Sequence, residues 1–189
     1  INKLSSTETW RLYDFFKEES VFLDIETDGL DKGADITVIG IFNGIETKTM
    51  IKGINLDYRT LKQELSKYKL IITFNGSSFD IPFIKKRYDI LPETPHIDLM
   101  HCCSRLGLRG GLKCIEKEFG IKRNNIIGKF SGGDVLSLWK IYRATGDKYY
   151  LNLLVEYNEE DVINLKKIMN HCYEGLKEHL QKEINVGEA

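Results

Sequence analysis

The sequence predicts an α/β domain in which a mixed sheet is flanked by helices. The first half contains three strand-like segments separated only by turns, which favours an antiparallel meander. Later apolar strands alternate with helical segments, a pattern typical of parallel strands. At 189 residues, 42% of them hydrophobic, the chain is long enough for one well-buried domain and short for two. We therefore expect residues 1–189 to form a single domain, and Ile1 in place of Met is consistent with excision from a longer chain.

The first half of the chain is expected to place one helix before the meander. Residues 6–18 begin with Ser or Thr and carry aromatic residues at helical spacing, which predicts a leading helix packed on the sheet. Val21–Glu26 is predicted to be a buried strand. Segments 36–44 and 45–53 are predicted to form two further strands around the hairpin signal Asn43-Gly44.

Strands and helices are expected to alternate after the meander. We predict a helix over 56–68, a short strand at Leu70–Phe74, a helix at Phe79–Tyr88 and a strand at His96–Leu99. The remainder, 104–182, is predicted to be helical, with glycines separating the helices.

Two acids at alternate positions end the first strand. Strand side chains repeat every two residues, so Asp24 and Glu26 leave the same face of the sheet. Two anions held close on a mostly apolar sheet repel each other and lose hydration, so they require a proton or a cation between them. The strand therefore predicts a metal site, provided that other segments supply more ligands.

Two later segments offer such ligands. Asp80 is expected at the start of a helix just past a strand end, where open α/β sheets bind their ligands. Tyr157 and Asp161 are four residues apart and share one helical face, whereas Glu159 and Glu160 are expected to point to solvent. Considered singly, each acid could be a cap or a solvated charge, and it is their combination that indicates a site.

Other polar residues are assigned structural roles. Asp98 lies near the same sheet edge and is expected to be a structural hydrogen-bond acceptor. The four cysteines show no disulfide framework, so reduced thiols are expected. Zinc binding is disfavoured because the CxxC pairing is missing from the candidate ligands His96, His101, Cys102 and Cys103.

Three motifs in order carry a resemblance to a known family. DIE at 24–26, NGSSFD ending at Asp80 and YNEED ending at Asp161 resemble the motifs of the DEDD (DnaQ-like) exonucleases of the RNase H-like superfamily, and the position of Tyr157 resembles the tyrosine-bearing DEDDy subgroup. HIDLM, GGLKCIEKEFGI and LVEYNEEDVINL also resemble the YprB-type predicted exonucleases, over most of residues 20–170. The resemblance implies an RNase H-like fold with a five-stranded sheet in the order 3-2-1-4-5.

The resemblance also implies a two-metal 3′-5′ exonuclease that releases nucleoside 5′-monophosphates. By similarity, Asp24 would bridge two ions about 4 Å apart, Glu26 and Asp161 would complete the first, and Asp80 would hold the second through water. Oxygen ligands favour Mg²⁺ or Mn²⁺. Tyr157, with an ordinary pKa near 10, is too weak a base at neutral pH and is assigned to orient the attacking water.

The expected partner is nucleic acid, bound at the single-stranded 3′ ends of DNA or RNA. Thr27, Leu30, Asn75 and Phe79 resemble positions that cradle the terminal nucleotide. Candidates for contacts with the backbone are the basic residues Lys85, Lys86, Arg87, Arg109 and Lys113.

Composition limits the alternatives. A net charge of −1 excludes a broad electrostatic grip on nucleic acid, and the absence of a long apolar run favours a cytoplasmic protein without membrane contact. An RNase H-like endonuclease and a non-catalytic nucleic-acid-binding module remain open as alternatives. The preference among DNA, RNA and short oligonucleotides is also open, as is the oligomeric state, for which a monomer is plausible.

Overall fold

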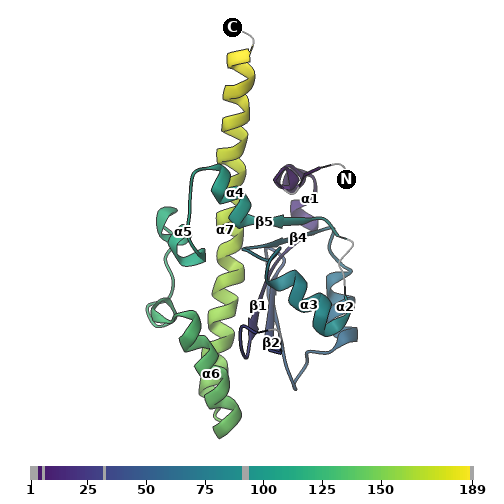
Figure 1. The fold of residues 1–189 in the computed structure, drawn as a ribbon, viewed down its shortest axis with the longest axis vertical. Helices are drawn as coiled ribbons and strands as arrows, with labels where there is room; N and C mark the ends of the chain where they lie inside the picture. The colour runs from purple at the N-terminus through teal and green to yellow at the C-terminus, as the bar shows by residue number, and fades with distance from the viewer. Residues whose placement is uncertain (1–3, 6, 32, 91–93, 188–189) are drawn as a thin grey trace.

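The computed structural model describes residues 4–5, 7–31, 33–90 and 94–187, with side chains described as far as residue 182. A central sheet separates one long helix from a pair of shorter helices (Figure 1). The order of strands and helices along the chain follows the predicted sequence of a meander and then alternating elements.

The leading segment is helical but is not one helix. It is divided into the 3-10 turn η1 (Thr9–Leu12), the helix α1 (Tyr13–Phe16) and the 3-10 turn η2 (Lys17–Glu19). None of the three has a side-chain cap, which is consistent with lengths of about one turn each. The single helix predicted over 6–18 was therefore wrong in its continuity, and its cap position at Ser6 lies outside the described residues.

The sheet is mixed and has the predicted order. Its strands run in the order β3-β2-β1-β4-β5. The β1–β2 and β2–β3 pairs are antiparallel, and the β1–β4 and β4–β5 pairs are parallel. The strand bounds are β1 (Ser20–Thr27), β2 (Ile36–Phe42), β3 (Thr47–Ile51), β4 (Leu70–Thr73) and β5 (His96–Asp98).

Six further α-helices and one 3-10 turn complete the described chain. Their bounds are α2 (Tyr58–Leu65), α3 (Asp80–Tyr88), α4 (Leu99–Arg105), α5 (Leu112–Glu118), η3 (Ile127–Lys129), α6 (Gly132–Thr145) and α7 (Lys148–Gly187). Helix α4 was missed from the sequence, where the helical remainder that follows the last strand was expected to begin only at residue 104. It begins directly after β5 because the Asp98 carboxylate accepts a hydrogen bond from the Met100 backbone and caps it.

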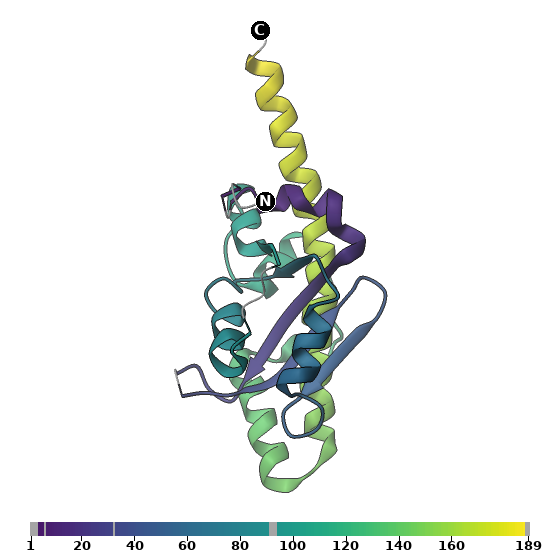
Figure 2. The ribbon, with the colours of Figure 1, turned by 90° about the vertical axis from the view of Figure 1, so that its right-hand side faces the viewer.

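The two faces of β1 bury different layers. Val21, Leu23 and Ile25 pack with residues of α2 and α3 in one hydrophobic cluster. Phe22 packs in another cluster together with residues of α7. Because strand side chains alternate, Asp24 and Glu26 lie on the same face of the sheet as Phe22. Both carboxylates therefore lie on the face of the sheet that α7 covers. Figures 1 and 2 show α7 on the opposite side of the sheet from α2 and α3.

Helix α7 is the longest element and crosses the sheet. Its 40 residues correspond to about 60 Å at 1.5 Å per residue. It packs against β1, β2, β3 and β4, and its C-terminal part extends beyond the sheet (Figures 1 and 2). In the described part of the chain, α7 included, the helices are too short or too polar to cross a membrane.

A glycine allows α7 to approach the sheet closely. Gly40 of β2 pairs with Asp24 of β1, and a Cβ at this glycine would lie 1.9 Å from Oδ1 of Asn158. A side chain at this position would push α7 away from β1. The absence of a side chain at residue 40 therefore fixes how near the residues of α7 come to Asp24.

Candidate metal centre

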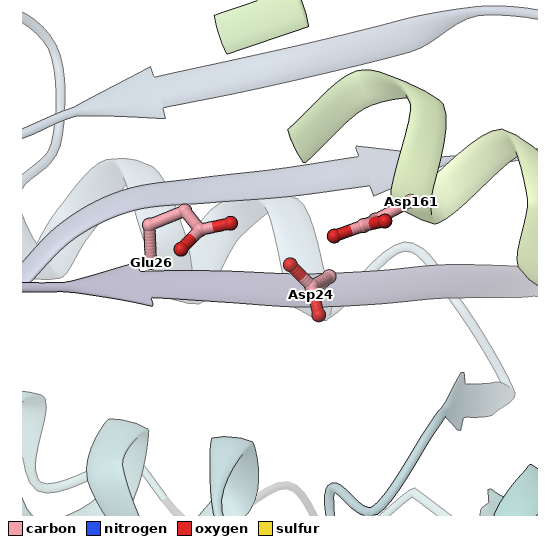
Figure 3. A group of neighbouring side chains, drawn as sticks. All are labelled: Asp24, Glu26 and Asp161. Carbon is pink, nitrogen blue, oxygen red and sulfur yellow. The ribbon is translucent and has the colours of Figure 1, made fainter. Parts of the chain in front are cut away.

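Three carboxylates from two elements meet between β1 and α7. Asp24 and Glu26 project from β1, and Asp161 approaches them from α7 (Figure 3). One oxygen from each of the three lies within 4.8 Å of the others. The alternation of β1 and the position of α7 thus place residues separated by more than 130 positions in one acidic group, which we call the acid cluster.

Burial and mutual repulsion make this group unfavourable as three free anions. The pKa values of Asp24 and Glu26 are raised well above their ordinary range, first by burial and then by the charges of Asp161 and Asp80. Burial also raises the pKa of Asp161, to about 6, although Arg123 opposes the shift. Protons or cations must therefore compensate the acid cluster.

Asp80 lies beside the acid cluster and has a defined hydrogen-bond role. Its Oδ1 accepts the backbone N–H of Ile25 at 3.0 Å, and the residue is only 2% exposed. The parallel pairing of β1 with β4 extends only as far as Phe22 and Ile72, so the carboxylate occupies the edge beyond it. Burial raises the pKa of Asp80 to about 7, against the effect of its backbone hydrogen bonds. Asp80 is thus outside the three-residue group but raises the pKa of both β1 acids.

Asp98 positions the loop that leads to Asp80. Its carboxylate accepts backbone N–H groups from Asn75 at 2.8 Å, Ser77 at 3.0 Å and Met100 at 3.0 Å. Asn75 has a φ of +61°, a conformation that asparagine tolerates better than most residues. The prediction that Asp98 is a structural acceptor is confirmed.

Cationic side chains surround Tyr157 and one side of the acid cluster. Arg123 forms ion pairs with Asp161 and with Glu116, the latter at 2.6 and 2.7 Å. Its guanidinium carbon lies 5.4 Å from the centre of the Tyr157 ring, and Nζ of Lys113 lies 5.1 Å from it. The pKa of Tyr157 is raised, mainly by burial and then by Asp161 and Glu26. Tyr157 therefore keeps its proton and is available as a hydrogen-bond donor.

Asn158 was missed by the sequence reasoning. It is fully buried, and its Nδ2 donates to Oδ2 of Asp24 at 2.9 Å. The available signal was that Asn158 interrupts a buried apolar stripe formed by Leu154, Val162 and Leu165. A buried polar residue in such a stripe requires a partner, and here the partner is a carboxylate of the acid cluster.

Glu159 and Glu160 do not point to solvent as expected. Both are half-buried. Glu159 accepts a hydrogen bond from Oγ1 of Thr49 on β3 at 2.9 Å, and Glu160 accepts the backbone N–H of Asn124 at 2.7 Å. The expectation failed because α7 has neighbours on several sides, so these two acids hold it against β3 and against the loop after α5.

The four residues proposed for the terminal nucleotide lie at or just past the ends of β1 and β4. Thr27 is buried and its Oγ1 donates to the Gly29 carbonyl at 2.6 Å, whereas Leu30 is 78% exposed. Asn75 is half-buried in the loop before α3, and the half-buried Phe79 ring lies 4.8 Å from that of Phe83. The structure thus leaves apolar surface accessible at residue 30 and in part at residue 79.

Several of the basic residues proposed for backbone contacts have partners within the chain. Arg87 pairs with Asp35 at 2.9 Å and donates from Nε to the Ala34 carbonyl at 2.9 Å, which holds the loop before β2. Lys113 donates to the Phe130 carbonyl. Arg109 is exposed and donates to Oγ of Ser104 at 3.5 Å.

The donor set fits a hard divalent cation. The acid cluster offers carboxylate oxygens only, the ligand type preferred by Mg²⁺ and Mn²⁺. Two of the four residues considered for zinc have other partners: Nε2 of His96 lies 2.8 Å from Oγ1 of Thr73, and the thiol of Cys103 lies 3.5 Å from that of Cys172. All four cysteines are unpaired, as expected.

Comparisons with known proteins agree with this architecture. The sequence profile of the RNase H superfamily matches residues 21–173. The uncharacterized protein YprB of Bacillus subtilis (strain 168) is 27% identical over 212 residues, which cover 100% of this chain and 50% of YprB. The chain thus spans half the length of the curated relative it matches.

Two solved structures share the fold. Brucella melitensis NrnC superposes with a TM-score of 0.64 at 20% identity, covering 90% of this chain and 80% of NrnC. Escherichia coli RNase D, an exoribonuclease involved in structured RNA processing, superposes with a TM-score of 0.61 at 17% identity. The similarity covers 90% of this chain and 43% of RNase D.

Proposed function

The chain belongs to the RNase H superfamily, and from this premise we propose that it is a metal-dependent 3′-5′ exonuclease of the DEDDy type. It would hydrolyse the terminal phosphodiester of a single strand and release nucleoside 5′-monophosphates. The observation that carries the proposal is the acid cluster, in which half-buried carboxylates from β1 and a buried one from α7 meet in a group whose charge protons or cations must compensate. The exonuclease named among its structural neighbours, RNase D, supports the same class of chemistry.

The metal ligands would be Asp24, Glu26, Asp80 and Asp161. The three acids of the acid cluster already lie within a small volume, and the hydrogen bond from Ile25 holds Asp80 beside them. Two Mg²⁺ or Mn²⁺ ions, once bound, would supply activation of water and neutralisation of charge on the leaving oxygen. We propose that bound ions, in place of protons, compensate the negative charge of these acids.

Side chains around the acid cluster would orient the reacting groups. Tyr157, which keeps its proton, would donate a hydrogen bond to the attacking water. Asn158 holds one carboxylate oxygen of Asp24, and Arg123 holds Asp161, so both acids are fixed before substrate arrives. Such support by neighbouring residues preserves ligand orientation in metal sites.

The terminal nucleotide would be held at the ends of β1 and β4. We propose that Leu30 and Phe79 provide apolar surface against the base, as apolar and aromatic side chains do in single-strand binding sites. Thr27 and Asn75 would line the same place, because Thr27 is the last residue of β1 and Asn75 lies in the loop just after β4.

A degradation assay tests the proposal. A single strand labelled at its 5′ end, incubated with Mg²⁺ or Mn²⁺, should shorten stepwise and release 5′-monophosphates, and chelation of the metal should stop it. Asp24→Asn should lower the rate by at least about 100-fold, because it removes a charged ligand. The matched control Asp14→Asn, an exposed position on α1, should keep the wild-type rate.

Substrate geometry separates the alternatives. A circular single strand should remain intact, since an exonuclease needs an end. Opening of the circle would indicate an endonuclease. Binding of the strand without hydrolysis, at high protein concentration and in both metals, would indicate a non-catalytic module and would refute the proposed activity.

A further inference from the structure

A basic cleft adjoins the acid cluster on the side of α5. It has a volume of about 340 Å³ and lies between α5 and residues 121–128. This is within the range of about 300–1,000 Å³ that is usual for ligand sites. Its lining includes one acid, Glu116, and four cationic side chains, those of Lys113, Lys117, Lys122 and Arg123. We call it the basic cleft.

The single acid does not neutralise the basic cleft. Both carboxylate oxygens of Glu116 accept from Arg123, and one of them also accepts from Nδ2 of Asn164 at 2.9 Å. Lys117 and Lys122 are exposed and, within the described part of the chain, form no ion pair. The cleft therefore concentrates positive charge on a chain whose net charge is −1.

A buried donor in the basic cleft is left without an acceptor. The Arg123 side chain is 6% exposed, and its Nε and Nη2 atoms are used by Glu116 and Asp161. Its Nη1 has no hydrogen-bond partner among the described residues. A buried donor of this kind costs free energy until an acceptor oxygen reaches it. Because Nη2 of the same guanidinium holds Asp161, one residue links the basic cleft to the acid cluster.

We propose that the basic cleft binds internucleotide phosphates of the strand on the 5′ side of the terminal nucleotide. The proposal rests on the proposed exonuclease function and adds the path of the substrate. A phosphate oxygen would satisfy Nη1 of Arg123, while Lys117 and Lys122 would neutralise the neighbouring charges. The amides of Asn124 and Asn125, which also line the cleft, add polar groups without sequence discrimination.

Charge reversal at the two exposed lysines tests the path. Lys117→Glu with Lys122→Glu should weaken binding of a fluorescent twelve-nucleotide strand, measured by anisotropy in EDTA, by tenfold or more. The dependence of log affinity on log salt should become shallower by about 0.7 for each lysine removed. The double Gln variant should show a smaller loss in the same direction. Lys182→Glu, an exposed position near the far end of α7, should bind within twofold of wild type.

Kinetic measurements distinguish binding of the strand in the basic cleft from an effect on the hydrolytic step. With the twelve-nucleotide strand the double Glu variant should raise KM about as much as it weakens binding and leave kcat within twofold. With a dinucleotide, whose only phosphate is the scissile one, KM should be unchanged. Thermal melting of both double variants within a few degrees of wild type would establish that the fold is intact.

Each other outcome has a definite meaning. If wild type degrades the strand while the variants show unchanged affinity and KM, the basic cleft is not the path and the exonuclease stands. If KM for the dinucleotide rises equally, the cleft does not act on the 5′ side. If wild type hydrolyses nothing but the double Glu variant still binds tenfold more weakly, the cleft binds nucleic acid and the exonuclease proposal fails.

Discussion

Asp24 shows how the surroundings of one residue define the candidate chemistry. It is held by the amide of Asn158, faces Asp161, and has no cationic group among its main electrostatic influences. Asp161 in contrast is paired with Arg123. Arg123 thus compensates Asp161 and Glu26, whereas Asp24 is the acid of the cluster that gains most from a bound cation.

The phenol of Tyr157 is expected to act through its hydroxyl group. Tyr157→Phe keeps the ring under Arg123 and Lys113 but removes the donor, so the fold should be unchanged. We expect kcat to fall by about 10- to 1,000-fold, with little change in KM or in the affinity for Mn²⁺. Single-turnover kinetics and calorimetric titration of Mn²⁺ measure the two quantities.

The control for this variant is a tyrosine of the same helix that lies outside the site. Tyr149→Phe, at an exposed position near the start of α7, should keep wild-type kcat. If Tyr157→Phe also kept wild-type kcat, the hydroxyl group would have no part in orienting water.

For single residues, the sequence predicted those features of the site that depend on spacing along the chain. It did not predict those that depend on tertiary contacts. The common face of Asp24 and Glu26 follows from the strand period alone. The partners of the acids, Asn158 and Arg123, depend on which elements pack together. Arg123 lies in a loop, where no periodicity marks a buried cation, and so it could not have been found.

The contact between β2 and α7 sets the geometry of the site at the level of elements. Three residues of the candidate centre, Tyr157, Asn158 and Asp161, belong to α7, while Asp24 belongs to β1. The two groups are brought together across Gly40, at which a Cβ would lie 1.9 Å from Oδ1 of Asn158 and 2.8 Å from its Cγ.

Gly40→Ala should therefore damage both stability and function. The added methyl group forces α7 outward or Asn158 out of its position, and overpacking of this kind costs about 1–3 kcal/mol. We expect a lower melting temperature together with weaker Mn²⁺ binding, because Asp161 moves away from Asp24.

Gly132→Ala provides the comparison. Gly132 starts α6, and a Cβ there meets no atom within 4 Å, so the substitution should be neutral or slightly stabilising. If Gly40→Ala bound Mn²⁺ as tightly as Gly132→Ala, the close approach would not control the site.

Predictions of elements succeeded according to the length and clarity of their patterns. The five strands and the helices α2 and α3 were found near their observed bounds, because each has a clear period or a buried apolar run, and α7 begins within the stretch predicted to be helical. Helix α4 was missed because its cap, Asp98, and its first residue, Leu99, lie in the stretch 96–99 that had been predicted as a strand. The leading segment was predicted as one helix because aromatic spacing does not reveal where a helix without caps ends.

For the whole molecule, the raised pKa values couple folding to pH and to metal. Without metal, the folded state keeps a proton on Asp80 up to about pH 7 and on Asp161 up to about pH 6, because these are their pKa values. The unfolded chain releases both protons near pH 4. The contribution of these two acids to the free energy of unfolding is thus fully present below about pH 4 and is lost as the pH rises towards about pH 7. The free energy of unfolding in EDTA should fall over this range by on the order of a few kcal/mol.

Denaturant titrations with and without Mg²⁺ measure this effect. Saturating Mg²⁺ should raise the free energy of unfolding most at the upper end of the range, because the metal binds the folded state with its acids ionised. Asp80→Asn keeps an oxygen to accept the Ile25 N–H and should flatten the profile measured in EDTA. Identical pH profiles for wild type and Asp80→Asn would contradict the assignment.

The continuity of α7 also limits how the sequence of this protein can change in length. A helix turns by about 100° per residue, so one residue inserted between Lys148 and Tyr157 would rotate Tyr157, Asn158 and Asp161 together, away from β1. Insertions and deletions in this part of the gene should accordingly be eliminated by selection. Buried contacts of α7 continue as far as Leu176, so the same constraint extends that far along the helix.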